Sequence, residues 1–264
     1  MKYLFKENLN RKFKKAKHLF LFLDYDGTLT SIVKTPSQAK ISSSTKEILS
    51  SLAKKKKIIL GIISGRSLEN IKKKITIKNI FYVGNHGLEI YFRGRKIWLM
   101  KKAKEYLRIL KKIKKDLKEN LKEIKGIVFE DKKVIYAVHY RQVSSPQLKE
   151  FKKIFKKTIS PYLKDKIKIG RGKKVFEIRP NIYFGKQVAL KLLQKLLKKK
   201  KDDFTIYIGD DLTDEEVFLS LDKKDLTVKV GKAKKSKAKY YLNNVKEVEK
   251  FLKYLNNTIS KTNY

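Results

Sequence analysis

Among the 264 residues of this chain, the fold is indicated most clearly by Leu21-Phe22-Leu23-Asp24-Tyr25-Asp26-Gly27-Thr28-Leu29-Thr30. Its continuously apolar start is typical of a strand that is buried on both faces of a parallel sheet. Asp24 and Asp26 follow directly, and because alternate residues of an extended segment share a face, they are expected to project together. Gly27 permits a tight turn and the close approach of a ligand, and Thr28 adds a hydroxyl. The stretch predicts a carboxylate site at the end of a buried strand.

Short apolar runs of the same kind recur along the chain, and most of them follow helix-like segments. The runs are residues 19–23, 58–63, 80–83, 205–208 and 226–230, and the helix-like segments include residues 44–53 and 187–197. Alternation of strands and helices predicts an α/β fold with a Rossmann-like parallel sheet, to which both ends of the chain contribute.

The middle of the chain has a different pattern. Apolar residues recur at helical spacing over residues 103–121, with lysines between them. Two strand-like pairs follow, residues 126–129 with 134–139 and residues 166–169 with 175–178, and a second helix is expected over residues 146–158. We therefore expect an α+β cap domain at residues 101–183, inserted into a core made of residues 1–100 and 184–264.

The composition is strongly basic, with 67 Lys and Arg against 26 Asp and Glu. Arginine occurs only eight times and the lysines are spread over every segment, whereas proteins that read bases rely on the bidentate arginine fork. The lysine excess is therefore interpreted as solvated surface, without a specific nucleic-acid partner. The absence of Cys excludes disulfides, thiolate catalysis and Cys-based zinc sites. No apolar run reaches the roughly 20 residues that cross a bilayer, and no secretion signal is evident, so we expect a soluble, cytoplasmic monomer without a membrane partner.

Four of the predicted core strands end in polar residues. These ends are Asp24 with Asp26, Ser64-Gly65-Arg66, Gly84-Asn85-His86-Gly87, and Gly209-Asp210-Asp211-Leu212-Thr213-Asp214-Glu215. Open α/β sheets bind ligands outside the carboxyl ends of their strands, so these residues are expected to meet at one edge.

The aspartates among these residues would repel one another unless a cation balanced them. Mg²⁺ takes one or two carboxylates, several waters and a substrate phosphate. Alternatively, Asp210 to Asp214 begin a helix that Thr213 and Asp214 cap, and Ser64-Gly65-Arg66 is an ordinary turn between a strand and a helix. Lys186 opens a helix directly after the predicted cap and, with Ser64, could neutralise phosphoryl oxygens.

These four motifs, in this order, resemble the haloacid-dehalogenase-like superfamily of hydrolases. The resemblance implies that Asp24 is the nucleophile, that Asp26 is the general acid and then the general base, and that Ser64 and Lys186 hold the phosphoryl group. It also implies Mg²⁺ bound by the Asp24 carboxylate, the Asp26 backbone carbonyl and Asp210, with Asp211 and Asp214 acting through water or through neighbours. Gln187 stands where this family often has glycine, which leaves Lys191 as an alternative to Lys186.

Within the superfamily, several stretches together resemble the trehalose-6-phosphate phosphatases. They are residues 23–29, 63–66, 84–89, 130–132, 139–141, 177–180 and 209–215. The resemblance implies hydrolysis of a sugar phosphate in trehalose biosynthesis. The chain has too little length left over for a synthase domain, so we expect a stand-alone phosphatase. The implied substrate contacts are Thr28, Gly65, Arg66, Asn85, His86, Glu130, Lys132, His139, Arg141, Glu177 and Arg179. From the residues alone, Glu130, Lys132, Glu177 and Arg179 could equally form cross-strand ion pairs.

Two alternatives remain open at this point. The core motifs also suit a related capped phosphatase that acts on sucrose 6-phosphate or mannosyl-phosphoglycerate. The net charge of +41 also suits a polyanion-binding protein that keeps a phosphatase core without turnover.

Overall fold

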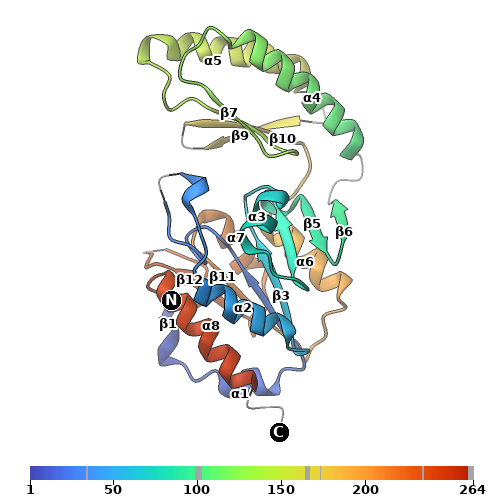
Figure 1. The fold of residues 1–264 in the computed structure, drawn as a ribbon, viewed down its shortest axis with the longest axis vertical. Coiled ribbons are helices and arrows are strands. Elements are labelled where there is room, and N and C mark those ends of the chain that lie inside the picture. Colours follow the sequence, from blue (N-terminus) through green and yellow to red (C-terminus); the bar gives the residue numbers. More distant parts are fainter. Residues whose placement is uncertain (34, 99–102, 164–166, 173, 234, 261–264) are drawn as a thin grey trace. The chain divides into compact units, whose positions relative to one another are not determined.

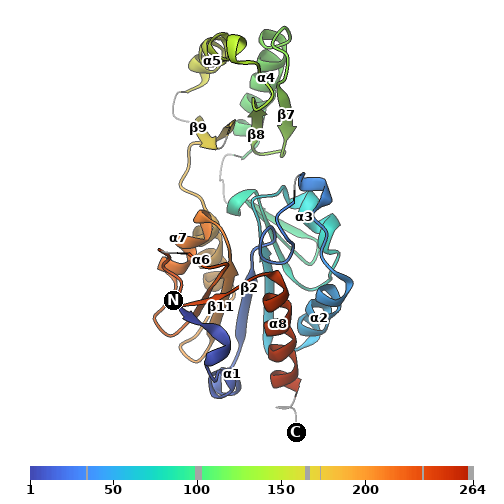
Figure 2. The ribbon, with the colours of Figure 1, turned by 90° about the vertical axis from the view of Figure 1, so that its left-hand side faces the viewer.

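The computed structural model describes residues 1–33, 35–98, 103–163, 167–172, 174–233 and 235–260. The chain divides into two compact units, one of Met1–Leu99 with Phe184–Tyr264 and one of Met100–Tyr183, which are called the core and the cap below (Figures 1 and 2). The first predicted domain boundary, between residues 100 and 101, lies outside the described residues.

Among the described residues of the core, nine strands form one sheet in the order β1-β13-β12-β11-β2-β3-β4-β5-β6. Neighbouring strands are parallel, except that β4 with β5 and β5 with β6 are antiparallel. The strands are β1 (Lys2–Tyr3), β2 (Leu19–Leu23), β3 (Ile58–Ile63), β4 (Phe81–Gly84), β5 (Glu89–Phe92), β6 (Arg95–Trp98), β11 (Phe204–Gly209), β12 (Leu226–Val230) and β13 (Tyr240–Leu242).

Helices cover both faces of this sheet, as Figure 2 shows. Alternate residues of β2 enter two different apolar clusters, with Leu19, Leu21 and Leu23 in one and Phe20 and Phe22 in the other. The first cluster also contains residues of α1, α2, α3 and α8, and the second contains residues of α6 and α7. The helices are α1 (Asn10–Lys15), α2 (Ser43–Lys54), α3 (Leu68–Ile75), α6 (Lys186–Leu196), α7 (Leu212–Ser220) and α8 (Val245–Ser260), and the short 3₁₀ turns are η1 (Leu4–Lys6), η2 (Pro36–Gln38) and η3 (Asn85–Gly87).

The five predicted core strands are confirmed as β2, β3, β4, β11 and β12, but the sequence did not predict the strands at either edge of the sheet. The hairpin of β5 and β6 was missed because charged and apolar residues mix over residues 89–98. Strand β6 is the edge strand of this hairpin, and charge on an edge strand discourages pairing with another chain.

The described part of the cap is a sheet with strand order β7-β8-β10-β9 and two long helices, all in the segments where the sequence predicted an α+β module. Every neighbouring pair of strands is antiparallel. Buried Leu110, Ile113 and Leu117 confirm the predicted apolar stripe of the first helix. The elements are α4 (Ala103–Asn120), β7 (Val128–Asp131), β8 (Tyr136–His139), α5 (Ser145–Ile159), η4 (Ser160–Tyr162), β9 (Ile167–Gly172) and β10 (Val175–Pro180).

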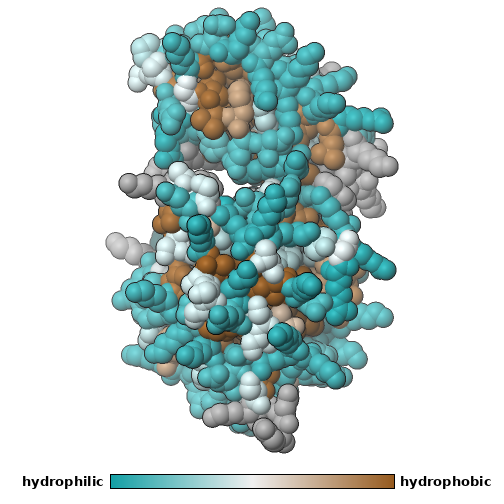
Figure 3. Space-filling model, viewed as in Figure 1, coloured by the Kyte–Doolittle hydropathy of each residue, from teal (hydrophilic) through white to brown (hydrophobic). Residues whose placement is uncertain are grey.

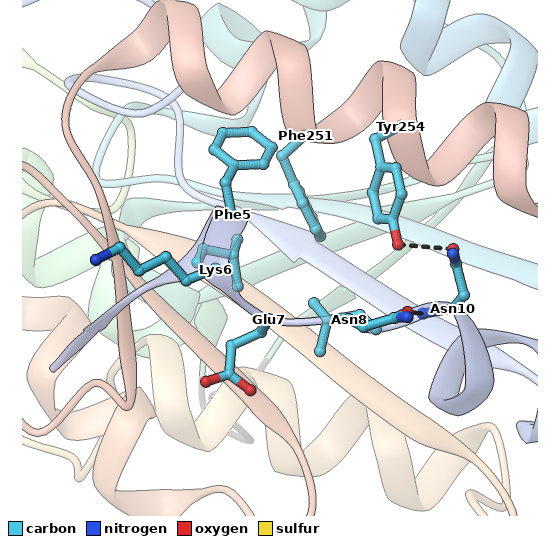
Figure 4. Close-up of a pocket in the computed structure, with 9 residues that line it drawn as sticks. Phe5, Lys6, Glu7, Asn8, Asn10, Phe251 and Tyr254 are labelled. Carbon is cyan, nitrogen blue, oxygen red and sulfur yellow. Dashed lines mark hydrogen bonds between the residues drawn. The ribbon is translucent and has the colours of Figure 1, made fainter.

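Hydrophilic residues dominate the molecular surface in Figure 3, as the lysine content requires. No helix in the described part of the chain is both long and apolar enough to cross a membrane. A cavity of about 310 Å³ lies between residues 4–10 and the Phe251 and Tyr254 side chains of α8 (Figure 4). None of the predicted site residues lines it, and the Tyr254 hydroxyl there donates to Asn10.

Candidate active site

Aspartates follow two neighbouring strands of the core sheet at the point where each strand ends. Strand β2 pairs in parallel with β11, so Leu23 lies opposite Ile208. The Asp24 backbone N–H donates to the Ile208 carbonyl at 2.9 Å, which extends this pairing by one residue. Asp24 and Asp210 therefore leave the sheet side by side, as the strand order predicts.

Gly27 shows how closely the two aspartate segments approach. Its φ is +79°, which favours glycine, and a Cβ built on it would lie 2.0 Å from the Asp210 carboxylate. A side chain at position 27 would displace that carboxylate. The turn after β2 and the turn after β11 therefore form one site although they are far apart in the sequence.

Lys186, the first residue of α6, lies among these aspartates with 2% of its surface exposed. Its Nζ donates to Asp24 Oδ1 and to Asp214 Oδ1, both at 2.8 Å, and lies 3.8 Å from Asp211 Oδ1. Lysine is buried this deeply only when carboxylates pair with it. The alternative, Lys191, is exposed on the same helix. The structure thus brings Lys186 to the aspartates and leaves Lys191 at the surface.

Asp211 and Asp214 cap the helix that follows β11. Asp211 Oδ1 accepts from the backbone N–H groups of Thr213 at 2.8 Å and Asp214 at 3.2 Å, while the Asp214 carboxylate bonds back to the Asp211 N–H. This is a capping box. The prediction that Thr213 and Asp214 cap this helix is thus wrong for Thr213, whose place Asp211 takes.

Asp214 has no oxygen left for a metal ion. Its Oδ1 accepts from Lys186 and, at 2.7 Å, from the Tyr207 hydroxyl, and its Oδ2 accepts from the backbone N–H groups of Asp210 at 2.9 Å and Asp211 at 3.0 Å. Four donors fill the roughly four lone-pair sites of a carboxylate. Asp214 therefore acts by holding Lys186 and the turn after β11.

Asp24 and Asp210 fit a metal site. One carboxylate oxygen each of Asp24, Asp210 and Asp214 lie within 4.8 Å of one another, and of these only Asp214 is filled. Asp210 Oδ1 is buried and has no hydrogen-bond partner among the described residues. A buried carboxylate oxygen without a donor is costly, and a hard cation relieves that cost.

The charges at this site are unbalanced. Burial raises the pKa of Asp24 well above its ordinary value, Lys186 opposes the rise, and Asp214 and Asp210 add to it. Burial, and then Asp211 and Asp214, raise the pKa of Asp210 to about 6. Burial acts to lower the pKa of Lys186, but Asp24, Asp214 and Asp211 outweigh it and raise that pKa. Four carboxylates surround one ammonium group, so a divalent cation would reduce the excess of negative charge.

Asp26 differs from the other aspartates because its side chain is 44% exposed. Arg66 donates to both of its oxygens, from Nε to Oδ2 at 2.7 Å and from Nη2 to Oδ1 at 2.6 Å. Ser64, 1% exposed, accepts the Arg66 backbone N–H on its Oγ at 3.1 Å, which leaves the hydroxyl hydrogen free to donate elsewhere. The structure therefore brings the first and second motifs together.

The loop after β4 packs against the second motif. A Cβ on Gly65 would lie 2.5 Å from the His86 ring, so glycine there lets the imidazole approach the backbone. Asn85 is fully buried and its Nδ2 donates to Glu89 Oε2 at 2.5 Å. Thr28 is also fully buried, and its Oγ1 has no partner among the described residues. The substrate contacts of these residues stay predictions.

In the cap, strand alternation places Glu130, His139, Glu177 and Arg179 on one face of the sheet, because Glu130 pairs with Ala137 and Ala137 with Glu177. Lys132 Nζ lies 3.0 Å from Glu177 Oε1 and 3.8 Å from Glu130 Oε2. His139 Nε2 lies 3.0 Å from Glu130 Oε2. Of the ion pairs that the sequence left open, those of Lys132 with Glu130 and Glu177 are therefore formed.

Two further predicted cap residues are Arg179 and Arg141. Arg179 lies across Gly170, where a Cβ would come within 2.7 Å of its Cζ. Arg141 is exposed in the turn after β8. Whether these cap residues bind a sugar stays a prediction.

Sequence reasoning missed two residues that hold the site from inside the sheet. Tyr207 is fully buried and its hydroxyl donates to Asp214. Lys229, 8% exposed, donates from Nζ to the Asp210 carbonyl at 2.5 Å. The sequence did contain a signal for each residue, namely one Tyr or one Lys within a mainly apolar strand. When such a strand is buried, the hydroxyl or ammonium group needs a hydrogen-bond partner nearby.

The profile of the family described as trehalose-phosphatase matches residues 22–246 of this chain. That span includes every aspartate of the site and the whole cap. The chain belongs to the trehalose-phosphatase family. Trehalose-phosphate phosphatase B of Arabidopsis thaliana is 33% identical to it over 254 residues, which cover 91% of this chain and 67% of that protein.

Solved structures show the same fold. The C-terminal domain of C. albicans trehalose-6-phosphate phosphatase matches with a TM-score of 0.72 and 27% identity, over 97% of this chain and 98% of that one. A trehalose-6-phosphate phosphatase related protein matches with a TM-score of 0.76 and 22% identity, over 92% of this chain and 99% of that one. At that lower identity the likeness concerns the fold alone.

Proposed function

We propose that this chain is a Mg²⁺-dependent phosphatase that hydrolyses trehalose 6-phosphate to trehalose and phosphate. The observation that carries the proposal is the group of Asp24, Asp210 and buried Lys186 at the carboxyl end of the sheet, in a chain of the trehalose-phosphatase family. Two carboxylates with unfilled oxygens suit a hard cation, and a lysine beside them suits a phosphoryl group.

In the proposed mechanism Asp24 attacks phosphorus in line and forms an aspartyl-phosphate, while Asp26 gives a proton to the departing sugar oxygen. Asp26 then takes a proton from the water that hydrolyses this intermediate. Lys186 and the Ser64 hydroxyl hold phosphoryl oxygens throughout both steps. Mg²⁺, bound by Asp24, Asp210 and the Asp26 carbonyl oxygen, would neutralise charge on the phosphoryl group.

The cap supports the sugar specificity in this proposal. A disaccharide presents many hydroxyls and no charge. Where a carboxylate and a cationic side chain lie within hydrogen-bonding distance of each other, the carboxylate can accept from one sugar hydroxyl while the cation donates to the next. The group of Glu130, Lys132, His139 and Glu177 has this arrangement on one face of the cap sheet.

A substrate panel tests the proposal. Phosphate release from trehalose 6-phosphate, sucrose 6-phosphate, mannosyl-phosphoglycerate and glucose 6-phosphate is measured with Mg²⁺ and with a chelator. We expect trehalose 6-phosphate to have the highest kcat/KM and the chelator to abolish release. Hydrolysis of trehalose 6-phosphate no faster than glucose 6-phosphate would reject the assigned sugar, and release unaffected by the chelator would reject the metal.

Glu177→Gln is expected to raise KM for trehalose 6-phosphate about tenfold and to change KM for an aryl phosphate less than about threefold, because a lost charged hydrogen bond to substrate costs about 1.5 kcal/mol or more. Steady-state kinetics on both esters check this. Asp131→Asn is the matched control, since Asp131 pairs with Lys114 at 2.7 Å on the other face of the same sheet. Equal changes in both variants would show that the effect is not specific to the Glu177 face.

In the metal-free protein, Asp210 should contribute less to stability as the pH rises. A carboxyl group whose pKa is raised on folding, as that of Asp210 is to about 6, binds extra protons in the folded state between its unfolded and folded pKa values. The contribution of Asp210 to the free energy of unfolding therefore falls as the pH rises from about 4 to about 6. Added Mg²⁺ should raise the unfolding midpoint more at about pH 7 than at about pH 4.5. Thermal unfolding with Mg²⁺ or chelator at both pH values measures this, and an equal Mg²⁺ effect would contradict it.

A further inference from the structure

Arg66 forms a bidentate ion pair with Asp26, and a third hydrogen bond fixes the orientation of the guanidinium group. The fork of Nε and Nη2 meets both Asp26 oxygens at 2.7 and 2.6 Å, and Nη1 donates to Asn70 Oδ1 at 3.2 Å. Bidentate arginine–carboxylate pairs fix the plane of the carboxylate as well as its distance. Asp26 has no other side-chain partner among the described residues, so its orientation depends on Arg66.

The guanidinium is itself held from several sides. The Arg66 side chain is 11% exposed, and its Cζ lies 5.3 Å from the ring centre of Tyr25. Tyr25 is fully buried, and its hydroxyl donates to the Ala39 carbonyl at 3.2 Å. The Asn70 partner stands on α3 and is also fixed at its backbone by Ser67. Rigid elements therefore aim the arginine fork at Asp26, and three of its five N–H donors point at side chains.

We propose that Arg66 is a positioning residue that sets the direction of the Asp26 carboxylate for proton exchange with the sugar oxygen. This inference rests on the proposed function, in which Asp26 is the general acid and base. The resemblance to known phosphatases had suggested a substrate contact for Arg66, and its observed bonds give it this different role. Asp26 is 44% exposed and so remains accessible to substrate while the Arg66 guanidinium is bonded to both of its oxygens.

Arg66→Lys tests the role, because lysine keeps the charge but cannot form the fork. In the first step a sugar oxygen needs a proton from Asp26, whereas p-nitrophenolate leaves without one. We expect kcat/KM for trehalose 6-phosphate to fall about 10- to 100-fold, and kcat/KM for p-nitrophenyl phosphate to change less than about threefold. The inhibition constant of inorganic phosphate should not change, since the phosphoryl contacts remain.

Three comparisons make the test specific. Asp26→Asn should show the same selectivity between the two esters, and the double variant should lose little more than Asp26→Asn alone, because both changes act on one group. Arg93→Lys, at an exposed arginine in the turn between β5 and β6, is the matched control and should leave both esters unchanged. Asn70→Ala, which removes the third bond, should give the same selectivity at about two- to fivefold even if Arg66→Lys folds poorly.

The outcomes separate this inference from the proposed function. Equal losses on both esters, with a raised inhibition constant for phosphate, would show that Arg66 binds the phosphoryl group and would overturn the inference. No loss with Arg66→Lys, or additive losses in the double variant, would overturn it as well. If the wild-type protein prefers another alkyl phosphate, the assigned sugar is wrong, while the same comparison with that ester still tests Arg66.

Discussion

Asp24→Asn is expected to lower turnover by at least about 10³-fold, because an amide cannot form the aspartyl-phosphate on which the proposed reaction depends. The same change should keep or raise the free energy of unfolding. Asp24 is 4% exposed, and burial raises its pKa although Lys186 opposes the rise, so its charged form is costly in the folded state without a metal ion. Phosphate release and thermal unfolding of the metal-free protein measure the two effects.

Asp211→Asn is the matched control for this variant. Asp211 lies in the same cluster, but it serves as the N-cap of α7, and Asn caps a helix as well as Asp does. We expect less than about tenfold loss of turnover from it. Activity of Asp24→Asn within tenfold of wild type would reject Asp24 as the nucleophile. A loss in Asp211→Asn as large as in Asp24→Asn would show that turnover depends on the total charge of the aspartate cluster and not on Asp24 in particular.

The sequence was enough to predict that the aspartates of the candidate site and Lys186 lie together. The run of residues 19–23 is apolar at every position, so it had to be a central strand, and the acidic residues after it and after residues 205–208 had to meet at the carboxyl edge. Position in the chain also distinguished Lys186 from the many other lysines, since it opens the first helix after the cap. These inferences depend on burial, which hydrophobic patterning indicates, and on the rule that an open α/β sheet binds ligands at the carboxyl ends of its strands.

The pairing inside the site could not be read in the same way. Arg66 and Asp26 are 40 residues apart, and their contact depends on side-chain rotamers and on the packing of Tyr25 beneath them. The role of Asp214 likewise depends on four donors that converge from a strand, a helix and two backbone amides. Residue type and spacing restrict which side chains can pair, but the pairs that form depend on where the folded backbone places them.

The edges of the sheet were missed for another reason. Strand β6 at the edge and its partner β5 contain polar residues at positions where a central parallel strand would be apolar, and a short edge strand needs few apolar residues. Glu89 illustrates the limit: it is 1% exposed and bonded to Asn85, although nothing in its sequence context indicates a buried acid. A buried polar group that is satisfied by its neighbours leaves no hydrophobic signal.

Lys186→Met is expected to lower the free energy of unfolding by about 3–5 kcal/mol near neutral pH, because it leaves buried Asp24 and Asp214 without their shared cation. Turnover should fall at least about 10²-fold as well, since an ammonium beside the phosphoryl oxygens is lost. The stability loss should shrink as the pH falls, because the pKa values of Asp24 and Asp214 are already raised and protonation removes the unpaired charges. Denaturant unfolding of the metal-free protein at several pH values measures this dependence.

Lys191→Met provides the control on the same helix. Lys191 is exposed, so its replacement should change stability by less than about 0.5 kcal/mol. A loss in Lys186→Met that is equally large at low and neutral pH would mean that the methionine disturbs packing and that the carboxylates do not set the cost. A loss that grows with pH, and that Mg²⁺ partly restores, would show that Lys186 and the proposed metal ion balance the same carboxylates, as a phosphatase site built on Asp24 requires.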